Sequence, residues 1–98
     1  MKQPTAILEH RGSAALDDYV VDIAWSPDAG RLAVAGGEGK VFLVMHDGSS
    51  LTARSVGEHG MGTIAVAWQP RGDVFVSTGQ DSRITLFDNE GRLVAQQR

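Results

Sequence analysis

Three side chains in the second half of the sequence are of the types that hydrolases use for nucleophilic catalysis. His59, Ser77 and Asp81 could supply a general base, a nucleophile and an orienting carboxylate. They could act in this way only if the fold places them within hydrogen-bonding distance of one another. At this point two interpretations stand open: a small hydrolase, or a structural use of the same three groups.

The glycine-rich segment 36–40 is similar to a phosphate-binding loop but lacks two of its parts. That loop has a glycine five residues before its Gly-Lys pair and a serine or threonine directly after it. Here Val34 and Val41 stand at those positions. The three histidines are too far apart in the sequence to form a spaced set of metal ligands. We therefore expect neither a cofactor nor a metal.

The composition is typical of one small soluble globular module. The chain has 98 residues, of which 42% are hydrophobic and 21% are charged. A formal net charge of -3 argues against a protein that binds nucleic acid by neutralising phosphates. The first apolar run, at 6–8, is too short for a signal peptide or a membrane-spanning helix. We expect a cytoplasmic protein that binds neither nucleic acid nor membrane.

An internal repeat with an offset of 43 residues organises the chain. When Trp25 is aligned with Trp68, six of 28 positions are identical across 21–48 and 64–91, and no gap is needed. Internal repeats of about 40–45 residues are typical of propeller blades, each of which has four strands. The spacing of the repeat therefore predicts two structurally equivalent units.

Each repeat contains four short segments with the composition of β-strands. β-Branched and aromatic residues dominate these segments, and proline, glycine or aspartate separate them. The pair Asp47-Gly48 is a typical hairpin turn. No stretch keeps a helical period, so we expect an all-β fold. The predicted strands are 19–25, 31–35, 40–45 and 51–56 in the first repeat and 63–68, 74–78, 83–88 and 92–96 in the second.

The predicted architecture is two four-stranded antiparallel propeller blades within a single module, 1–98. The blades span about 19–56 and 63–97, and the segment 5–10 is a candidate for an extra or closing strand. Apolar residues occur on both faces of the first two strands in each blade, so both faces need cover.

Two blades alone would leave apolar groups on their outer faces, whereas a ring of this kind has roughly four to eight blades. We expect these groups to include Leu32, Val41, Phe75 and Ile84. The propeller would then be completed either by oligomerisation or by further parts of a longer chain. Three molecules would give six blades and four would give eight.

The second repeat resembles the WD-repeat propeller family. The segment 66–70 is similar to the family's apolar-Ala-aromatic-Ser-Pro turn, and Phe87 stands at the tryptophan of its Trp-Asp pair. His59, Ser77 and Asp81 stand where the family has a hydrogen-bonded network of His, Ser and Asp with that tryptophan. The resemblance thus implies a structural network and no catalytic residue. The network would be partial, because phenylalanine has no N–H to donate.

The resemblance covers about residues 16–96, and the first repeat departs further from the family pattern. Leu16, Val34 and Glu38 occupy the His, Ser and Asp positions of the first repeat. We therefore expect apolar packing alone to hold the first blade together.

The resemblance implies a non-catalytic scaffold for contacts with other protein chains rather than an enzyme. An acidic rim beside an exposed tyrosine could accept a basic peptide. The alternative function is self-assembly of a propeller fragment, excised or engineered, whose partners are further molecules of the same chain. The candidate interaction rim consists of Asp17, Asp18, Tyr19, Glu38 and Glu58.

Overall fold

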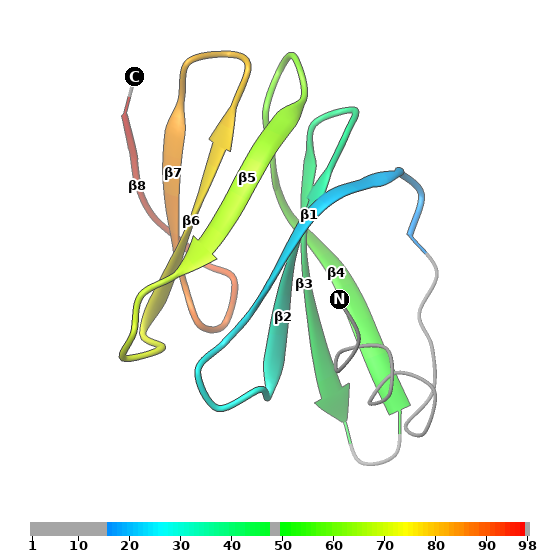
Figure 1. Cartoon of the computed structure of the whole chain (residues 1–98), viewed down its shortest axis with the longest axis vertical. Helices are drawn as coiled ribbons and strands as arrows, with labels where there is room; N and C mark the ends of the chain where they lie inside the picture. The colour runs from blue at the N-terminus through cyan, green and yellow to red at the C-terminus, as the bar shows by residue number, and fades with distance from the viewer. Residues whose placement is uncertain (1–15, 48–49, 98) are drawn as a thin grey trace.

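The fold consists of two four-stranded antiparallel sheets that stand side by side (Figure 1). This computed structural model describes residues 16–47 and 50–97, and no helix occurs in those ranges. Neighbouring strands are consecutive in the sequence, and the expected all-β class is confirmed. The first sheet contains β1 (Val20–Trp25), β2 (Arg31–Gly36), β3 (Lys40–Asp47) and β4 (Ser50–Glu58). The second sheet contains β5 (Thr63–Trp68), β6 (Val74–Gly79), β7 (Ile84–Asp88) and β8 (Leu93–Gln97).

The third and fourth strands of the first sheet are longer than the sequence predicts. Their antiparallel pairing extends from Lys40 opposite Glu58 to Asp47 opposite Ser50. Two features of the sequence-based prediction, the closing strand at 5–10 and the hairpin residue Gly48, lie outside the described residues.

The turn between the first two strands has the same backbone form in both sheets. In the first sheet, Asp28 Oδ1 accepts hydrogen bonds from the Ser26 hydroxyl at 2.7 Å and from the Gly30 N–H at 2.9 Å. Ala29 lies in the left-handed region with φ 59°, and Gly72, its equivalent 43 residues later, has φ 80°. Because this region favours glycine, the two turns share a conformation that suits only the second of them fully.

Both sheets also carry a bulge at the same place in the repeat. Val21 is the extra residue in the pairing of β1 with β2, and Ile64 is the extra residue in the pairing of β5 with β6. A bulge leaves the extra residue outside the ladder and increases the local twist. The 43-residue repeat is therefore a repeat of backbone geometry as well as of residue type.

The main core lies between the two sheets, where small residues of one meet aromatic residues of the other. Ala33 and Ala35 of β2 are fully buried in the same cluster as Phe75 and Phe87. The Phe75 ring lies 5.0 Å from Phe87 and 4.9 Å from Trp68, measured between centroids. Alanine on one side makes room for three rings on the other, so the sheets approach closely without leaving voids.

Two hydrogen bonds fix β1 against β5, which run side by side in the middle of the molecule (Figure 1). The indole Nε1–H of Trp68 donates to the carbonyl oxygen of Ala24 at 2.8 Å. The backbone N–H of Val66 donates to Asp22 Oδ2 at 3.1 Å. Directional bonds of this kind set the register between the sheets, which apolar packing alone would fix less strictly.

A second apolar cluster lies on the face of the first sheet that points away from the second sheet. We call this surface the outer face of the first sheet. Its buried members are Leu32, Val34, Phe42 and Val44, with Leu16, Ile23, Trp25, Leu51 and Ala53 packed against them.

The expectation that four apolar residues lie uncovered on outer faces is wrong for three of them. Val41 and Phe75 point into the core between the sheets, and Leu32 is buried in the second cluster. Ile84 is 45% exposed, on the face of the second sheet that points away from the first. Two sheets therefore bury more of their apolar surface than the sequence indicates, and exposed apolar residues remain on β1 of the first sheet and on β5, β7 and β8 of the second.

Candidate functional site

The structure brings His59, Ser77 and Asp81 together at one end of the second sheet. His59 Nδ1 lies 2.9 Å from Asp81 Oδ1, and His59 Nε2 lies 2.9 Å from Ser77 Oγ. Because a carboxylate oxygen can only accept, Nδ1 carries a proton, and a ring with this one proton accepts at Nε2. The Ser77 hydroxyl then donates to Nε2. The three side chains link the β4–β5 loop, the middle of β6 and the β6–β7 turn.

Asp81 is also bonded to the backbone around it. Its Oδ2 accepts from the Gly60 N–H at 3.0 Å, and its Oδ1 accepts from the Arg83 N–H at 3.1 Å. Burial raises the pKa of Asp81, but the hydrogen bonds from Gly60, His59 and Arg83 outweigh it and bring the pKa to about 2. Asp81 is therefore ionised at neutral pH and holds the β6–β7 turn against the loop before β5.

A glycine makes the close approach of the His59 ring to β6 feasible. A Cβ at Gly79 would overlap the imidazole of His59, and the neighbouring turn begins at this same residue. The backbone N–H of His59 donates to the Gly39 carbonyl at 2.7 Å, which joins the network to the β2–β3 turn of the first sheet. The network is thus continuous from one sheet to the other.

The same bonding order occurs in hydrolytic triads, but the accessibility differs. The side chains of His59 and Ser77 are 1% and 0% exposed, respectively. A nucleophilic hydroxyl has to reach a substrate carbonyl, and general acid–base catalysis requires the ring to reach the same substrate. Neither group can do so from a closed position between packed strands.

The first sheet has a carboxylate-to-backbone contact of its own, which the sequence-based prediction missed. Asp18, in the loop before β1, accepts from the Glu38 N–H at 3.0 Å and from the Lys40 N–H at 3.5 Å. In the second sheet the carboxylate comes from the turn and bonds to the loop, whereas here it comes from the loop and bonds to the turn. The expectation of apolar packing alone in the first blade is therefore wrong. The adjacent acidic pair Asp17-Asp18 was the one feature of the sequence that could have indicated this contact.

The five residues of the candidate rim lie at the end of the molecule that carries the β2–β3, β4–β5 and β6–β7 turns, because Asp17, Asp18 and Tyr19 contact residues 37–40 of the β2–β3 turn. These turns are uppermost in Figure 1. Tyr19 is 63% exposed and its ring lies against Gly37. Glu38 and Glu58 are exposed. Asp17 pairs with the Lys40 ammonium at 2.6 Å, a hydrogen bond that lowers the pKa of Asp17. Since Asp17 and Asp18 already have partners, three rim side chains remain for a ligand.

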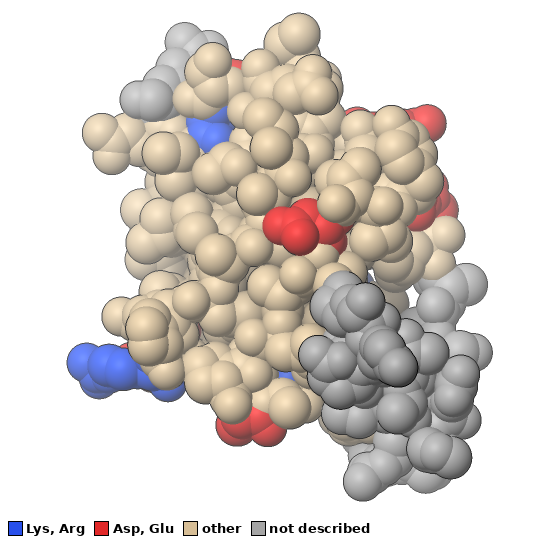
Figure 2. Space-filling model, viewed as in Figure 1, with Lys and Arg blue, Asp and Glu red and all other residues tan. Residues whose placement is uncertain are grey.

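The charge distribution supports a division between this rim and the surface beside it. In Figure 2 the face over β1 and β5 is largely uncharged, with acidic side chains near its middle and at its margin and basic ones toward its margin. Its exposed apolar residues include Val20, Val21 and Ile64.

Comparison with known families places a recognised unit across both sheets. Residues 51–88 match the family model described as WD domain, G-beta repeat. The chain contains a WD repeat. The matched WD repeat begins in β4 of the first sheet and ends at β7 of the second, and it includes His59, Ser77 and Asp81. No curated protein matches the chain. The resemblance drawn from the second half of the sequence is therefore confirmed.

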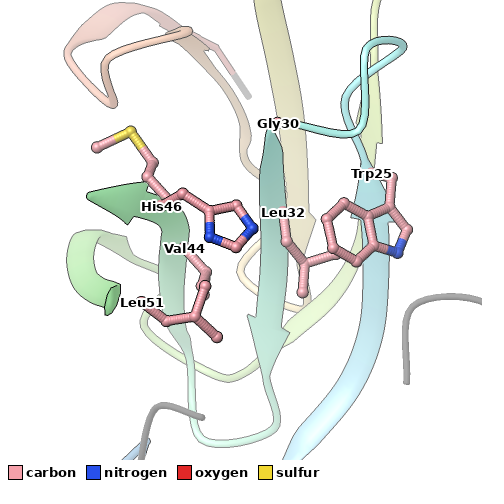
Figure 3. A pocket seen from close by; sticks show the side chains of 7 residues that line it. Trp25, Gly30, Leu32, Val44, His46 and Leu51 are labelled. Atoms are coloured by element: carbon pink, nitrogen blue, oxygen red, sulfur yellow. The ribbon is translucent and has the colours of Figure 1, made fainter. Parts of the chain in front are cut away.

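Beyond the WD repeat, a small hollow lies on the outer face of the first sheet (Figure 3). Its volume of about 10 Å³ is enough for about one water molecule and for nothing larger. Trp25 and His46 contribute to its wall, and their Nε1 and Nδ1 atoms are buried without a hydrogen-bond partner among the described residues. Figure 3 shows the indole nitrogen of Trp25 on the side of the ring away from Leu32 and His46.

Two further features are absent from the described residues. Within 16–47 and 50–97, no group of three or more His, Cys, Asp or Glu side chains is arranged to hold a metal ion. In the same ranges there is no helix with the length and apolar character needed to cross a membrane.

Proposed function

We propose that the chain is a non-catalytic WD-repeat scaffold that mediates contacts between proteins. The observation that carries this proposal is the burial of His59 and Ser77 inside a network that joins two sheets. Groups held in this way stabilise the loops at the rim, and WD repeats as a family serve protein interaction. The proposal assigns a structural role to His59, Ser77 and Asp81, and it keeps the cytoplasmic location expected from the sequence.

The interaction surface is the rim formed by Tyr19, Glu38 and Glu58. An exposed phenol ring offers contact area at low entropic cost, and two carboxylates favour a partner with lysine or arginine side chains. The network around Asp81 and the contacts of Asp18 hold the turns that present these groups. A basic, extended peptide fits this chemistry.

A labelled peptide of alternating lysine and glycine tests the rim directly by fluorescence anisotropy. The double variant Glu38→Lys/Glu58→Lys should weaken binding at least fivefold, and added salt should weaken binding to the natural rim. Asp73→Lys, on an exposed turn at the opposite end, is the matched control and should leave binding unchanged. Equal affinity of all three proteins would remove the rim from the proposal.

Self-association is the second candidate function, and it is favoured by the exposed apolar side chains of the second sheet. Ile84, Leu93 and Val94 are each about half exposed or more. Exposed apolar side chains on two neighbouring strands are typical of an interaction surface. Sedimentation velocity over a range of concentrations tests this candidate, and a single monomeric species throughout would remove it.

A further inference from the structure

The repeat relates the two sides of the contact between the sheets to the two outer faces of the molecule. The second sheet packs on the first through Val66, Trp68, Phe75 and Phe87. Their equivalents 43 residues earlier all belong to the outer face of the first sheet: Ile23, Trp25, Leu32 and Val44. The outer face of the first sheet is therefore built like the surface with which the second sheet packs on the first.

The opposite relation holds for the side of the first sheet that receives the second. This side presents Ala24, Ala33, Ala35, Val41 and Leu43 to the core. The equivalent residues define what we call the outer face of the second sheet: Ala67, Val76, Thr78, Ile84 and Leu86.

Exposure shows that the outer face of the second sheet lacks a neighbour. Val41 is 0% exposed between the sheets, whereas Ile84, its equivalent, is 45% exposed. Ala33 and Leu43 are fully buried, whereas Val76 and Leu86 are only partly buried. The second sheet thus has the same receiving surface as the first, without a sheet packed on it in the described structure.

The repeat also relates the tryptophan hydrogen bond between the sheets to a pair of groups on the two outer faces. Between the sheets, Trp68 Nε1–H donates to the Ala24 carbonyl. Trp25 is the equivalent donor, and its Nε1 is buried without a partner among the described residues. Ala67 is the equivalent of Ala24, and it is exposed on the receiving face. A buried unpaired donor is costly, so an acceptor from another molecule would be stabilising once the groups packed over the outer face have moved aside.

We propose that two molecules associate head to tail, with the outer face of the first sheet of one packed on the outer face of the second sheet of the other. In this contact the Trp25 indole N–H donates to the Ala67 carbonyl of the neighbouring molecule. The contact repeats the one already present between the sheets. This proposal rests on the self-association put forward above and specifies its surfaces, direction and register.

The contact between molecules is weaker than the contact within one molecule, for two reasons. The Val66 N–H bonds to the Asp22 carboxylate between the sheets, but Ala65 stands at the position equivalent to Asp22 and offers no carboxylate. Leu32 and Val44 on the outer face of the first sheet are also only 5% and 7% exposed in a single molecule, so Leu16 and the other groups packed there have to move aside before a neighbour can bind. We therefore expect association that depends on concentration in the micromolar range.

Sedimentation velocity on the full chain and three variants tests the proposal. Ile84→Lys places a charge in the centre of the contact and should weaken association at least a hundredfold. Trp25→Phe removes one N–H donor and should weaken it about fivefold. Ile64→Lys is the matched control: its equivalent Val21 stays 46% exposed beside the contact between the sheets, so association should be unchanged. Circular dichroism verifies that each variant is folded.

The outcomes separate this inference from self-association in general. If the natural chain is monomeric at every concentration, both are wrong. If it associates and the folded Ile84→Lys and Trp25→Phe variants associate equally well, only the head-to-tail contact is wrong. Equal losses for Ile84→Lys and Ile64→Lys would also overturn the contact, because they would indicate an unspecific apolar surface.

Discussion

Two carboxylates, Asp81 and Asp18, show how single residues secure the rim of this molecule. Asp81 joins a turn to a loop through two backbone N–H groups and the ring of His59. Asp18 does the corresponding work in the first sheet through Glu38 and Lys40. Hydrogen bonds to an ionised acceptor are stronger than those between neutral groups, so both contacts are expected to matter for local order.

Replacement of Ser77 by alanine should reduce stability without changing any enzymatic property. The buried Nε2 of His59 loses its donor, and a buried polar group without a partner costs about 1–3 kcal/mol. Urea denaturation measures the loss, and Ser55→Ala, at an exposed position of β4, should leave the midpoint unchanged. An ester hydrolysis activity that is present in the natural protein and lost in Ser77→Ala would contradict the structural role.

Acid should destabilise the protein partly through Asp81. Its folded pKa of about 2 lies below the ordinary value of 3.8, so the unfolded chain takes up the proton first as pH falls. The stabilising contribution is complete above the ordinary pKa and is lost as pH falls towards 2. Asp81→Asn should therefore show a smaller drop in melting temperature between pH 5 and pH 2 than the natural protein, measured by circular dichroism. Parallel melting curves for the two proteins would contradict this account.

At the scale of elements, the equivalent turns show where the repeat is conserved in backbone form but not in residue type. Ala29 and Gly72 adopt the same left-handed conformation, with φ 59° and 80°. Residues with a Cβ are strained in that region by about 1–2 kcal/mol. Glycine loses more backbone entropy on folding, which offsets part of this difference.

Exchanging the residue types in these turns should shift stability in opposite directions. Ala29→Gly should stabilise the protein by about 0.5–1 kcal/mol, and Gly72→Ala should destabilise it by a similar amount. A Cβ at Gly72 would meet Pro27 Cδ at 3.4 Å, an ordinary contact, so backbone strain rather than a clash decides the result. Chemical denaturation of both variants measures the two shifts, and shifts of the same sign would show that the turns are not equivalent.

Much of the element scale could be predicted from the sequence because the signals are local. Alternating β-branched residues and turn residues located all eight strands, and the repeat located their partners. The ends of β3 and β4 could not be predicted in this way, because pairing across the hairpin extends them. The contact of Asp18 with the β2–β3 turn also depends on tertiary placement. For Leu32, the expected exposure was wrong because Leu16, Trp25 and Leu51 pack against the cluster to which it belongs.

At the scale of the whole molecule, the two sheets share one core and should unfold together. Phe87 lies in that core between Phe75 and the first sheet, and a Cβ at Gly57 of β4 would already crowd its ring. Phe87→Ala should lower the free energy of unfolding by about 3–5 kcal/mol. Hydrogen exchange should then show β2 and β6 losing protection to a similar degree. Selective loss in β6 would indicate that the first sheet is stable alone.

The unit matched as a WD repeat does not coincide with one sheet, because it contains β4 of the first sheet and β5 to β7 of the second. Within this unit, His59 directly follows the last strand of the first sheet, whereas Ser77 and Asp81 belong to the second sheet. When a gene gains one whole unit of this kind, the added segment contains all three side chains of the network. The new sheet is therefore linked by this network to the strand before it. A cut made in the β4–β5 loop after His59 would instead separate the histidine from its hydroxyl and carboxylate partners. A division inside a sheet keeps the three side chains together.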